Sequence, residues 1–142
     1  MMRRLKNAKL ERMKKLAAAL AIKTNKQKII IGLVGGLGSG KTSFVKAFAK
    51  NLNIKHVKSP TFTIINSYRR PNGYFYHLDL YRLKRFSQLT ALGFKELISK
   101  PSSLILIEWA DKFKEVKKNC NLIIKFDFGV QSYERNITII EK

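Results

Sequence analysis

A glycine-rich run of eight residues, Gly35-Gly36-Leu37-Gly38-Ser39-Gly40-Lys41-Thr42, limits the possible folds of this chain more than any other feature. The run matches the pattern G-x-x-x-x-G-K-[ST]. Residues 28–34, which precede it, are apolar as in a buried parallel strand, and residues 42–51, which follow it, show the apolar spacing of a helix. A strand, a glycine-rich loop and a helix in this order are the context that a phosphate-binding loop (P-loop) requires.

The residue types of this loop suit the binding of a nucleoside triphosphate. Glycines allow backbone N–H groups to curl around phosphates, and the helix that starts near Lys41 directs the positive end of its dipole at them. Lys41 can reach the β- and γ-phosphates, while the hydroxyl of Thr42 can ligate Mg²⁺. The dinucleotide pattern G-x-G-x-x-G does not fit, because Lys41 occupies the place of its last glycine. The flanking strand and helix disfavour the alternative of a merely glycine-rich turn.

Two carboxylates are candidates to complete such a site. Asp79 lies within the predicted strand over 73–80, and Glu108 directly follows the apolar strand over 103–107. In open α/β sheets, ligands bind at the carboxyl ends of the strands, which is where Glu108 lies. Either residue alone could be a solvated acid at a strand end. Next to a P-loop, however, we expect both to act, because nucleotide-bound magnesium is held with the help of carboxylates.

Two nearby features are open to more than one interpretation. Alternation along the strand puts His77 on the same face as Asp79, where it either orients that carboxylate or fills a polar niche in the core. The segment Ser59-Pro60-Thr61 lies where a switch segment could fall between helix and sheet. From the residues alone, the better interpretation is a turn in which Pro60 stops helix formation.

The remaining periodicity predicts one α/β domain with a mixed sheet flanked by helices. A basic helix is expected over 5–22 and a polar connector over 24–28, so that residues 1–27 precede a nucleotide-binding core over 28–142. The pair Asn72-Gly73 favours a hairpin. The other elements are expected as strands over 61–68, 73–80, 103–107, 121–128 and 135–140, and as short helices over 86–92 and 95–99.

Charge and cysteine content narrow the possible functions. The 29 basic and 9 acidic residues give a net charge of +20, which attracts phosphate backbones. A generally lysine-rich composition is the alternative explanation, and no interleaving of aromatic and basic residues marks a base-stacking surface. Direct nucleic-acid binding is therefore not the main function that we expect. The single cysteine, Cys120, excludes an internal disulfide and a cysteine-based zinc site.

The sequence gives no sign of a membrane protein or a secreted one. No apolar run approaches the roughly 20 residues that a membrane helix needs. Residues 1–22 could be compared with a signal peptide, but their apolar part is short, and Lys23 ends it without a small-residue cleavage site. We expect a cytoplasmic protein.

Five motifs follow one another in order along most of the chain. They are the loop Gly35–Thr42, then Ser59-Pro60-Thr61-Phe62-Thr63, then His77-Leu78-Asp79-Leu80-Tyr81-Arg82-Leu83, then Leu92-Gly93-Phe94-Lys95-Glu96-Leu97, and finally Ile107-Glu108-Trp109. This order strongly resembles the TsaE family, the P-loop ATPases of bacterial tRNA threonylcarbamoyladenosine biosynthesis. The resemblance covers about residues 10 to 140, and it depends on all five motifs, because the P-loop alone indicates only a superfamily.

The resemblance implies a P-loop fold and a magnesium-dependent ATPase whose activity is weak in isolation. It implies partnership with TsaB-like and TsaD-like proteins, the latter of which transfers the threonylcarbamoyl group to the adenosine next to the anticodon. In this family, ATP binding and hydrolysis reset the complex for another cycle, and the ATPase does not perform the transfer. Contact with tRNA is therefore expected to be indirect.

Roles for individual residues also follow from the resemblance. Lys41 would hold phosphates, and Thr42 with Asp79 would hold magnesium. Thr61 would act as a sensor near the γ-phosphate or the metal. Glu108 would position or activate the attacking water beside the metal.

Other positions are less well defined. Trp109 would lie beside the nucleotide or at a partner interface, although an ordinary core aromatic is an equal alternative. Two positions depart from the family, which often has an acidic residue in place of Gly36 and a proline in place of Ala110. Neither change removes a phosphate or metal ligand, so nucleotide binding is expected to persist.

Two other functions remain as alternatives. The first is a stand-alone P-loop kinase for a small metabolite, although the domain is too compact for an acceptor pocket with a lid, and no arginine-rich lid segment is evident. The second is a binding module that is gated by a nucleotide and does not hydrolyse it. The preference for adenine over guanine comes from the family, because the N-K-x-D pattern of GTPases is absent.

Overall fold

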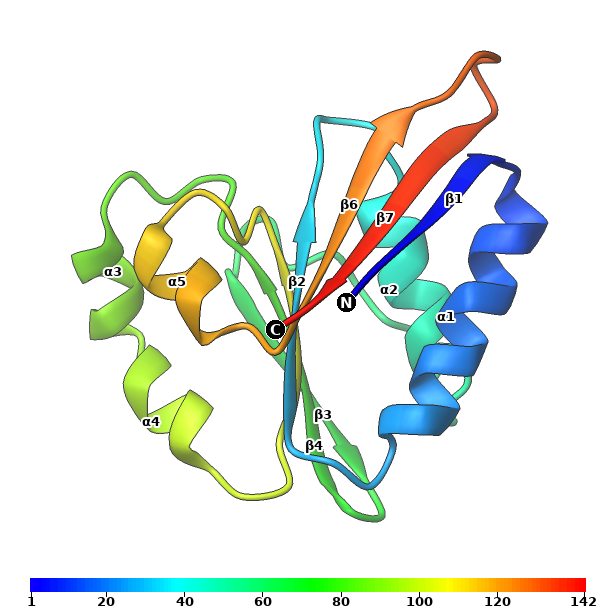
Figure 1. Ribbon diagram of the computed structural model, residues 1–142. Helices are drawn as coiled ribbons and strands as arrows, with labels where there is room; N and C mark the ends of the chain where they lie inside the picture. Colours follow the sequence, from blue (N-terminus) through cyan, green and yellow to red (C-terminus); the bar gives the residue numbers. More distant parts are fainter.

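The computed structural model describes residues 1–142, which form a seven-stranded sheet with helices on both faces (Figure 1). The strands are β1 (Met2–Ala8), β2 (Ile29–Val34), β3 (Ile65–Arg70), β4 (Gly73–Asp79), β5 (Leu104–Glu108), β6 (Leu122–Phe128) and β7 (Arg135–Glu141). The helices are α1 (Leu10–Thr24), α2 (Lys41–Lys50), α3 (Phe86–Ala91), α4 (Phe94–Ser99) and α5 (Lys114–Asn119).

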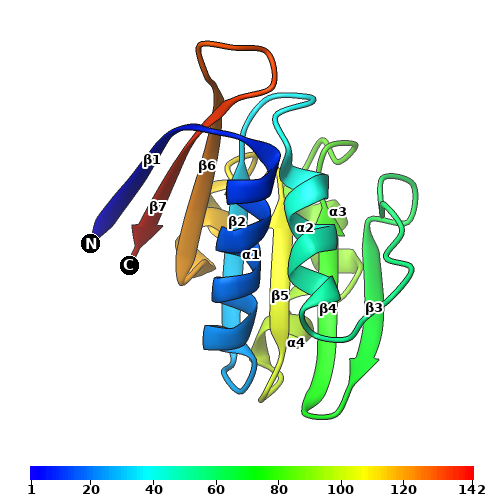
Figure 2. The same ribbon diagram turned by 90° about the vertical axis from the view of Figure 1, so that its right-hand side faces the viewer.

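The sheet is mixed, as the sequence predicts, with the strand order β1-β7-β6-β2-β5-β4-β3. β2 pairs in parallel with β5 and β6, and β5 pairs in parallel with β4. The pairs β3–β4, β6–β7 and β1–β7 are antiparallel. Helices α1 and α2 cover one face of the sheet, while α3, α4 and α5 cover the other (Figures 1 and 2). None of these helices combines the length and the apolar character that crossing a membrane would require.

An apolar core lies on each face of the sheet, and β2 contributes to both. Ile31 and Leu33 join the cluster under α1 and α2, whereas Ile30 joins the cluster under α3, α4 and α5. A central parallel strand that is covered on both sides must be apolar at nearly every position. This requirement explains the unbroken apolar run that precedes the glycine-rich loop.

The N-terminal segment differs from the expected helix over 5–22. Residues 2–8 form β1, an edge strand that pairs with β7, and the helix begins only at Leu10. Leu5 and Ala8 are the buried residues of β1, and their spacing of three is typical of a helix. The strand accommodates this spacing because its register shifts between these two residues, where Asn7 has a φ of 48°.

Two other segments differ from the prediction. The strand expected over 61–68 starts at Ile65, because residues 61–64 form a turn in which the backbone N–H of Ile64 donates to the carbonyl of Pro60. Helix α5 is not predicted, since it has six residues and only Val116 is buried. The hairpin between β3 and β4 is confirmed, with Arg70 opposite Gly73. The other predicted strands and helices agree with the structure to within one or two residues.

The register of the three central strands aligns their carboxyl ends. Glu108 of β5 pairs with Leu33 of β2 on one side and with Asp79 of β4 on the other. The glycine-rich loop starts two residues after Leu33. Both candidate carboxylates therefore lie in one row beside the loop, at the carboxyl edge of the sheet.

The close packing around Gly32 yields a prediction about stability. A Cβ atom at this position would lie 2.7 Å from Cβ of Ala110 and 2.9 Å from Sγ of Cys120. We expect Gly32→Ala to lower the free energy of unfolding by about 1–3 kcal/mol, the usual effect of overpacking. The control is Gly36→Ala, because a Cβ there would meet no atom within 4 Å. Urea denaturation measures both variants, and equal stability of the two would contradict the packing argument.

Candidate functional site

The loop between β2 and α2 needs glycine at two positions for definite reasons. Gly35 has a φ of 154°, and a Cβ there would lie 2.6 Å from Oγ of Ser39 and 2.7 Å from the carbonyl oxygen of Phe126. Gly40 precedes the first residue of α2 and has a φ of 109°, in the left-handed region. These two positions let the loop turn back on itself at the N-terminus of α2, where backbone N–H groups are free to bind an anion.

Lys41 is buried at the base of this loop. Its Nζ donates to the carbonyl oxygens of Gly35 at 2.5 Å and Gly36 at 2.8 Å, and it lies 4.3 Å from the centre of the Trp109 ring. Burial lowers the pKa of Lys41, and the negative charges of nearby Glu108 and other carboxylates partly offset this shift. The ammonium group is therefore held by carbonyl dipoles and an aromatic face, and an anion in the loop would add a strong charge partner.

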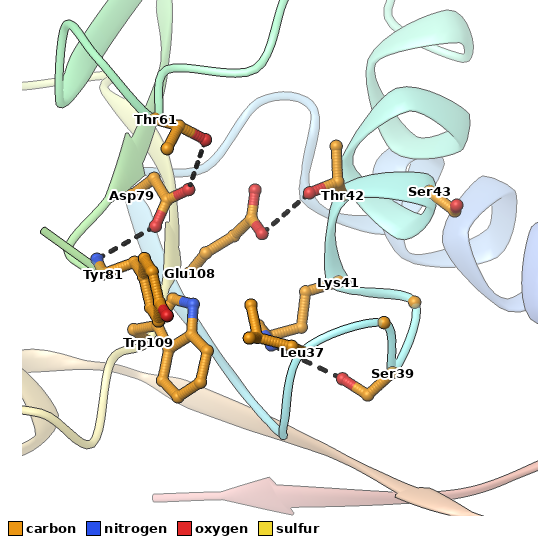
Figure 3. Close-up of a pocket in the computed structure, with 12 residues that line it drawn as sticks. Leu37, Ser39, Lys41, Thr42, Ser43, Thr61, Asp79, Tyr81, Glu108 and Trp109 are labelled. Carbon is orange, nitrogen blue, oxygen red and sulfur yellow. Dashed lines mark hydrogen bonds between the residues drawn. The ribbon is translucent and has the colours of Figure 1, made fainter.

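Glu108 is the centre of a hydrogen-bonded chain. Its Oε1 accepts a hydrogen bond of 2.9 Å from the hydroxyl of Thr42, as Figure 3 shows, and its Oε2 lies 2.6 Å from Nε2 of His77. The side chain of His77 is 0% exposed and that of Glu108 is 4% exposed. His77 thus contacts Glu108, and the interpretation that it orients Asp79 is wrong.

Asp79 is held by a second set of contacts. Its Oδ2 accepts a hydrogen bond of 3.2 Å from the hydroxyl of Thr61, and its Oδ1 accepts one of 3.0 Å from the backbone N–H of Tyr81 (Figure 3). Thr61 in turn shares a hydrogen bond of 2.7 Å with Ser59. Pro60 and Thr61 lie at the start of the turn that precedes β3, and Thr61 also reaches the candidate site.

A cavity of about 330 Å³ lies between these groups. Figure 3 shows Lys41, Thr42 and Glu108 pointing into the space that Thr61 and Asp79 close from the other side. The structure thus brings together most of the residues that the sequence predicts. The cavity is lined by Leu37, Gly38, Ser39, Gly40, Lys41, Thr42, Ser43, Thr61, Asp79, Tyr81, Glu108 and Trp109. Gly35 and Gly36 shape the loop without lining the cavity.

Trp109 lies at the rim of this cavity and is only partly buried. Its φ of 61° is unusual for a residue with a side chain, and it follows directly after Glu108 at the end of β5. The indole ring packs against the ring of Tyr81, with 5.1 Å between the ring centres. Trp109 therefore forms one wall of the site together with Tyr81, a residue that we did not predict to be there.

A second cavity, of about 270 Å³, lies on the other side of the glycine-rich loop. It shares Gly38, Ser39, Gly40 and Ser43 with the first cavity, so the two adjoin at the loop. Its outer wall includes Lys9, Leu10, Tyr133 and Arg135, which come from the start of α1 and from the β6–β7 connection and β7. An elongated ligand could occupy both cavities with its middle part on the loop.

Arg135 is a further residue that the sequence prediction missed. Its Nε donates to the carbonyl oxygen of Ser39 at 3.0 Å, and its Nη2 donates to that of Gly38 at 2.9 Å. These bonds fix the outer side of the loop. No motif marks Arg135, because it comes from β7 at the far end of the chain and meets the loop only in the folded sheet.

Comparisons with known proteins show which family this chain is similar to. The family model described as "Threonylcarbamoyl adenosine biosynthesis protein TsaE" matches residues 7–137. A protein of Aquifex aeolicus named tRNA threonylcarbamoyladenosine biosynthesis protein TsaE is 35% identical over 116 residues, which cover 80% of this chain and 77% of the relative. A protein of the same name from Borreliella burgdorferi is 45% identical over 80 residues, covering 56% of this chain and 58% of the relative.

A solved structure shows the same fold. The crystal structure of Bacillus subtilis YdiB superimposes with a TM-score of 0.74 and 28% sequence identity, covering 99% of this chain and 86% of that chain. The match includes both edges of the sheet, because it extends over nearly the whole chain. The predicted P-loop fold with a mixed sheet is therefore confirmed.

The contacts of Arg135 predict its contribution to nucleotide binding. Arg135→Met keeps an unbranched side chain but removes both hydrogen bonds to the loop carbonyls. We expect the Kd for ATP to rise about 5- to 30-fold, because loss of these bonds frees the loop at a cost of about 1–2 kcal/mol. Titration with a fluorescent ATP analogue measures the change. The control is Arg69→Met, which changes an exposed arginine on β3; equal affinities of the two variants would exclude a role for Arg135.

Proposed function

The chain belongs to the TsaE family, whose members are tRNA threonylcarbamoyladenosine biosynthesis proteins, and on this basis we propose that it is the ATP-binding and ATP-hydrolysing subunit of that modification system. The observation that carries the proposal is the convergence of Lys41, Thr42, Asp79 and Glu108 on one cavity beside a P-loop. The matched segment spans 58% of the length of the Borreliella relative, less than two thirds.

The phosphates of ATP would lie on the glycine-rich loop. Lys41 is within reach of a bound phosphate, because its Nζ already rests on the carbonyls of Gly35 and Gly36. On binding, the ammonium group exchanges these neutral acceptors for phosphate oxygens, which form stronger, charge-assisted hydrogen bonds. The N-terminus of α2 adds backbone N–H donors and the positive end of the helix dipole.

The donor set of the cavity fits a magnesium ion. Thr42 offers a hydroxyl oxygen, and Asp79 and Glu108 offer carboxylates, the hard oxygen ligands that Mg²⁺ prefers. No group of three or more His, Cys, Asp or Glu residues is close enough to hold a metal alone. This agrees with Mg²⁺ in nucleotide sites, which is usually bound by one or two carboxylates together with phosphates and water. When bound, the ion would neutralise charge on the phosphates.

Hydrolysis requires a water molecule in line with the γ-phosphate. Its oxygen would form a bond to phosphorus as the bond to the leaving ADP oxygen breaks, and the water would pass a proton to the carboxylate of Glu108. Glu108 would orient this water by accepting its hydrogen bond, because the carboxylate reaches the cavity next to Thr42. Thr61, which donates a hydrogen bond to Asp79, would sense the presence of the γ-phosphate from the opposite wall of the cavity.

The adenine ring would occupy the second cavity. The γ-phosphate must face the carboxylates of the first cavity, so the rest of the nucleotide extends across the loop in the opposite direction. There Tyr133 offers an aromatic surface, and Nζ of Lys9 lies 5.7 Å from the centre of its ring. Stacking of a base on an aromatic ring stabilises a complex by about 1–3 kcal/mol.

The partners would be TsaB-like and TsaD-like proteins in the cytoplasm. Their transferase carries out the modification, and ATP hydrolysis by this chain would reset the complex for another cycle. Contact with tRNA would be indirect, through the partners. The support for these partners is family membership, since the family is named for a tRNA modification.

ATP hydrolysis by the purified chain tests the proposed function. We expect slow Mg-dependent turnover alone and faster turnover with both partners, measured as phosphate release, and no turnover with excess EDTA. Lys41→Ala should reduce the rate at least about 100-fold, because it removes a cation that stabilises the charge of the transferred phosphoryl group. Turnover that is indifferent to the partners would exclude the role in the complex, and a merely few-fold loss in Lys41→Ala would contradict the P-loop assignment.

Glu108→Ala separates binding from hydrolysis. We expect this variant to bind ATP with an affinity within a few-fold of the parent but to hydrolyse it at least about 100-fold more slowly, the usual effect of removing a general base. Single-turnover hydrolysis and nucleotide titration measure the two properties. Glu115→Ala, which changes an acid on α5 outside the cavity, is the control. Normal hydrolysis by Glu108→Ala would show that another group positions the water.

A further inference from the structure

We infer that His77 is a positioning residue for Glu108: its neutral imidazole donates the Nε2 proton to Oε2 and thereby leaves Oε1 to serve the nucleotide. The inference rests on the proposed function, because it assigns His77 a task in the hydrolysis that Glu108 assists. The contact that carries it is the 2.6 Å separation between Nε2 and Oε2 of two almost fully buried side chains.

The sheet brings these two side chains together. His77 lies on β4 opposite Leu106 of β5, two residues before the pair of Asp79 and Glu108. Alternation along both strands points His77 and Glu108 to the face covered by α2, where Phe75 and Leu106 belong to the apolar core. His77 is thus set back from the cavity, which it does not line, and reaches it only through Glu108.

The surroundings of the imidazole select its tautomer. Nδ1 of His77 is buried and has no hydrogen-bond partner. A proton on Nδ1 would leave a buried N–H without an acceptor, which is more costly than an unpaired lone pair at a nitrogen that carries no proton. The proton therefore resides on Nε2, where an ionised Glu108 accepts it. The hydroxyl of Thr42, a donor to Oε1, agrees with an ionised carboxylate.

The two oxygens of Glu108 consequently have different tasks. Oε2 is held from behind by His77, whereas Oε1 faces Thr42 at the cavity. If the Thr42 hydroxyl turns to a cation, as proposed above, Oε1 becomes free to accept a hydrogen bond from water. Without His77, Oε2 would lose its donor in an apolar setting, and the carboxylate would rotate toward other donors such as Lys41. We expect hydrolysis to suffer while nucleotide affinity is retained.

Substitutions of His77 by side chains of different length test whether it positions Glu108. The amide nitrogen of glutamine can take the place of Nε2, whereas that of asparagine corresponds to Nδ1 and stops short of Glu108. We expect His77→Asn and His77→Leu to lower kcat about 10- to 100-fold, the range for one hydrogen bond to a charged group. The Kd for ATP should stay within about 3-fold in both variants, and His77→Gln should recover most of the lost kcat. Equal kcat in the Asn and Gln variants would overturn the inference.

A double variant separates positioning from a general structural effect. If His77 acts only through Glu108, adding His77→Leu to Glu108→Ala should change kcat less than about 2-fold. A further 10-fold loss would show that His77 acts elsewhere. Normal hydrolysis by Glu108→Ala would instead refute the proposed role of Glu108, and with it the task of His77 in hydrolysis.

Nitrogen NMR of the nucleotide-free and metal-free chain gives a readout that does not depend on activity or on any His77 variant. The chain has only two histidines, and the exposed His56 serves as the internal reference. We expect ¹⁵N shifts and couplings that place a single proton on Nε2 of His77 and leave Nδ1 without a proton. In Glu108→Ala this preference should weaken. A proton on Nδ1 of His77 in the parent chain would overturn the inference even if Glu108 proves essential.

Discussion

The parallel pairing of β2, β5 and β4 is the constraint on which the site depends. One register sets Leu33, Glu108 and Asp79 side by side at the carboxyl edge of the sheet. Because β2 leads directly into the glycine-rich loop, the same register fixes the distance between the loop and both carboxylates. A slip of one residue in β5 would turn Glu108 to the opposite face, under α3, α4 and α5. Such a slip is opposed because it would place the carboxylate among the apolar side chains of that face, away from Thr42 and His77.

Within this frame, the polar groups of the site satisfy one another. The Lys41 ammonium rests on loop carbonyls, the Thr42 hydroxyl bonds to Glu108, and Asp79 is held by Thr61. Buried polar groups need such partners, since each unpaired one would destabilise the fold by about 1–3 kcal/mol. The positive φ of Trp109 belongs to the same arrangement, because it turns the chain sharply after Glu108 and brings the indole ring over Lys41.

The sequence predicts the features that are encoded locally. The loop, the strand before it, the helix after it and the strand-end carboxylates each follow from a short run of residues. It does not predict contacts that depend on a strand far along the chain, such as the bonds from Arg135 to the loop or the contact of His77 with Glu108. The N-terminal strand cannot be predicted for another reason: the irregular register of β1 lets Leu5 and Ala8 both face the core with a helical spacing.

Because the polar groups of the site are already hydrogen-bonded to one another, a ligand must replace those hydrogen bonds with contacts of its own. A phosphate group alone would compete only for Lys41 and the backbone N–H groups, and a cation alone would compete only for Thr42 and the carboxylates. A phosphate alone would leave Glu108 bonded to Thr42, and a cation alone would leave Lys41 on the carbonyls of Gly35 and Gly36. In the proposed function, a nucleotide that carries its own Mg²⁺ would exchange both sets of contacts at once. Lys41 would then meet phosphate and the carboxylates would meet the ion, so that opposite charges are joined in a partly buried cavity. In the proposed function, the site would therefore bind the metal–nucleotide complex in preference to either component, and release of Oε1 of Glu108 would follow arrival of the ion.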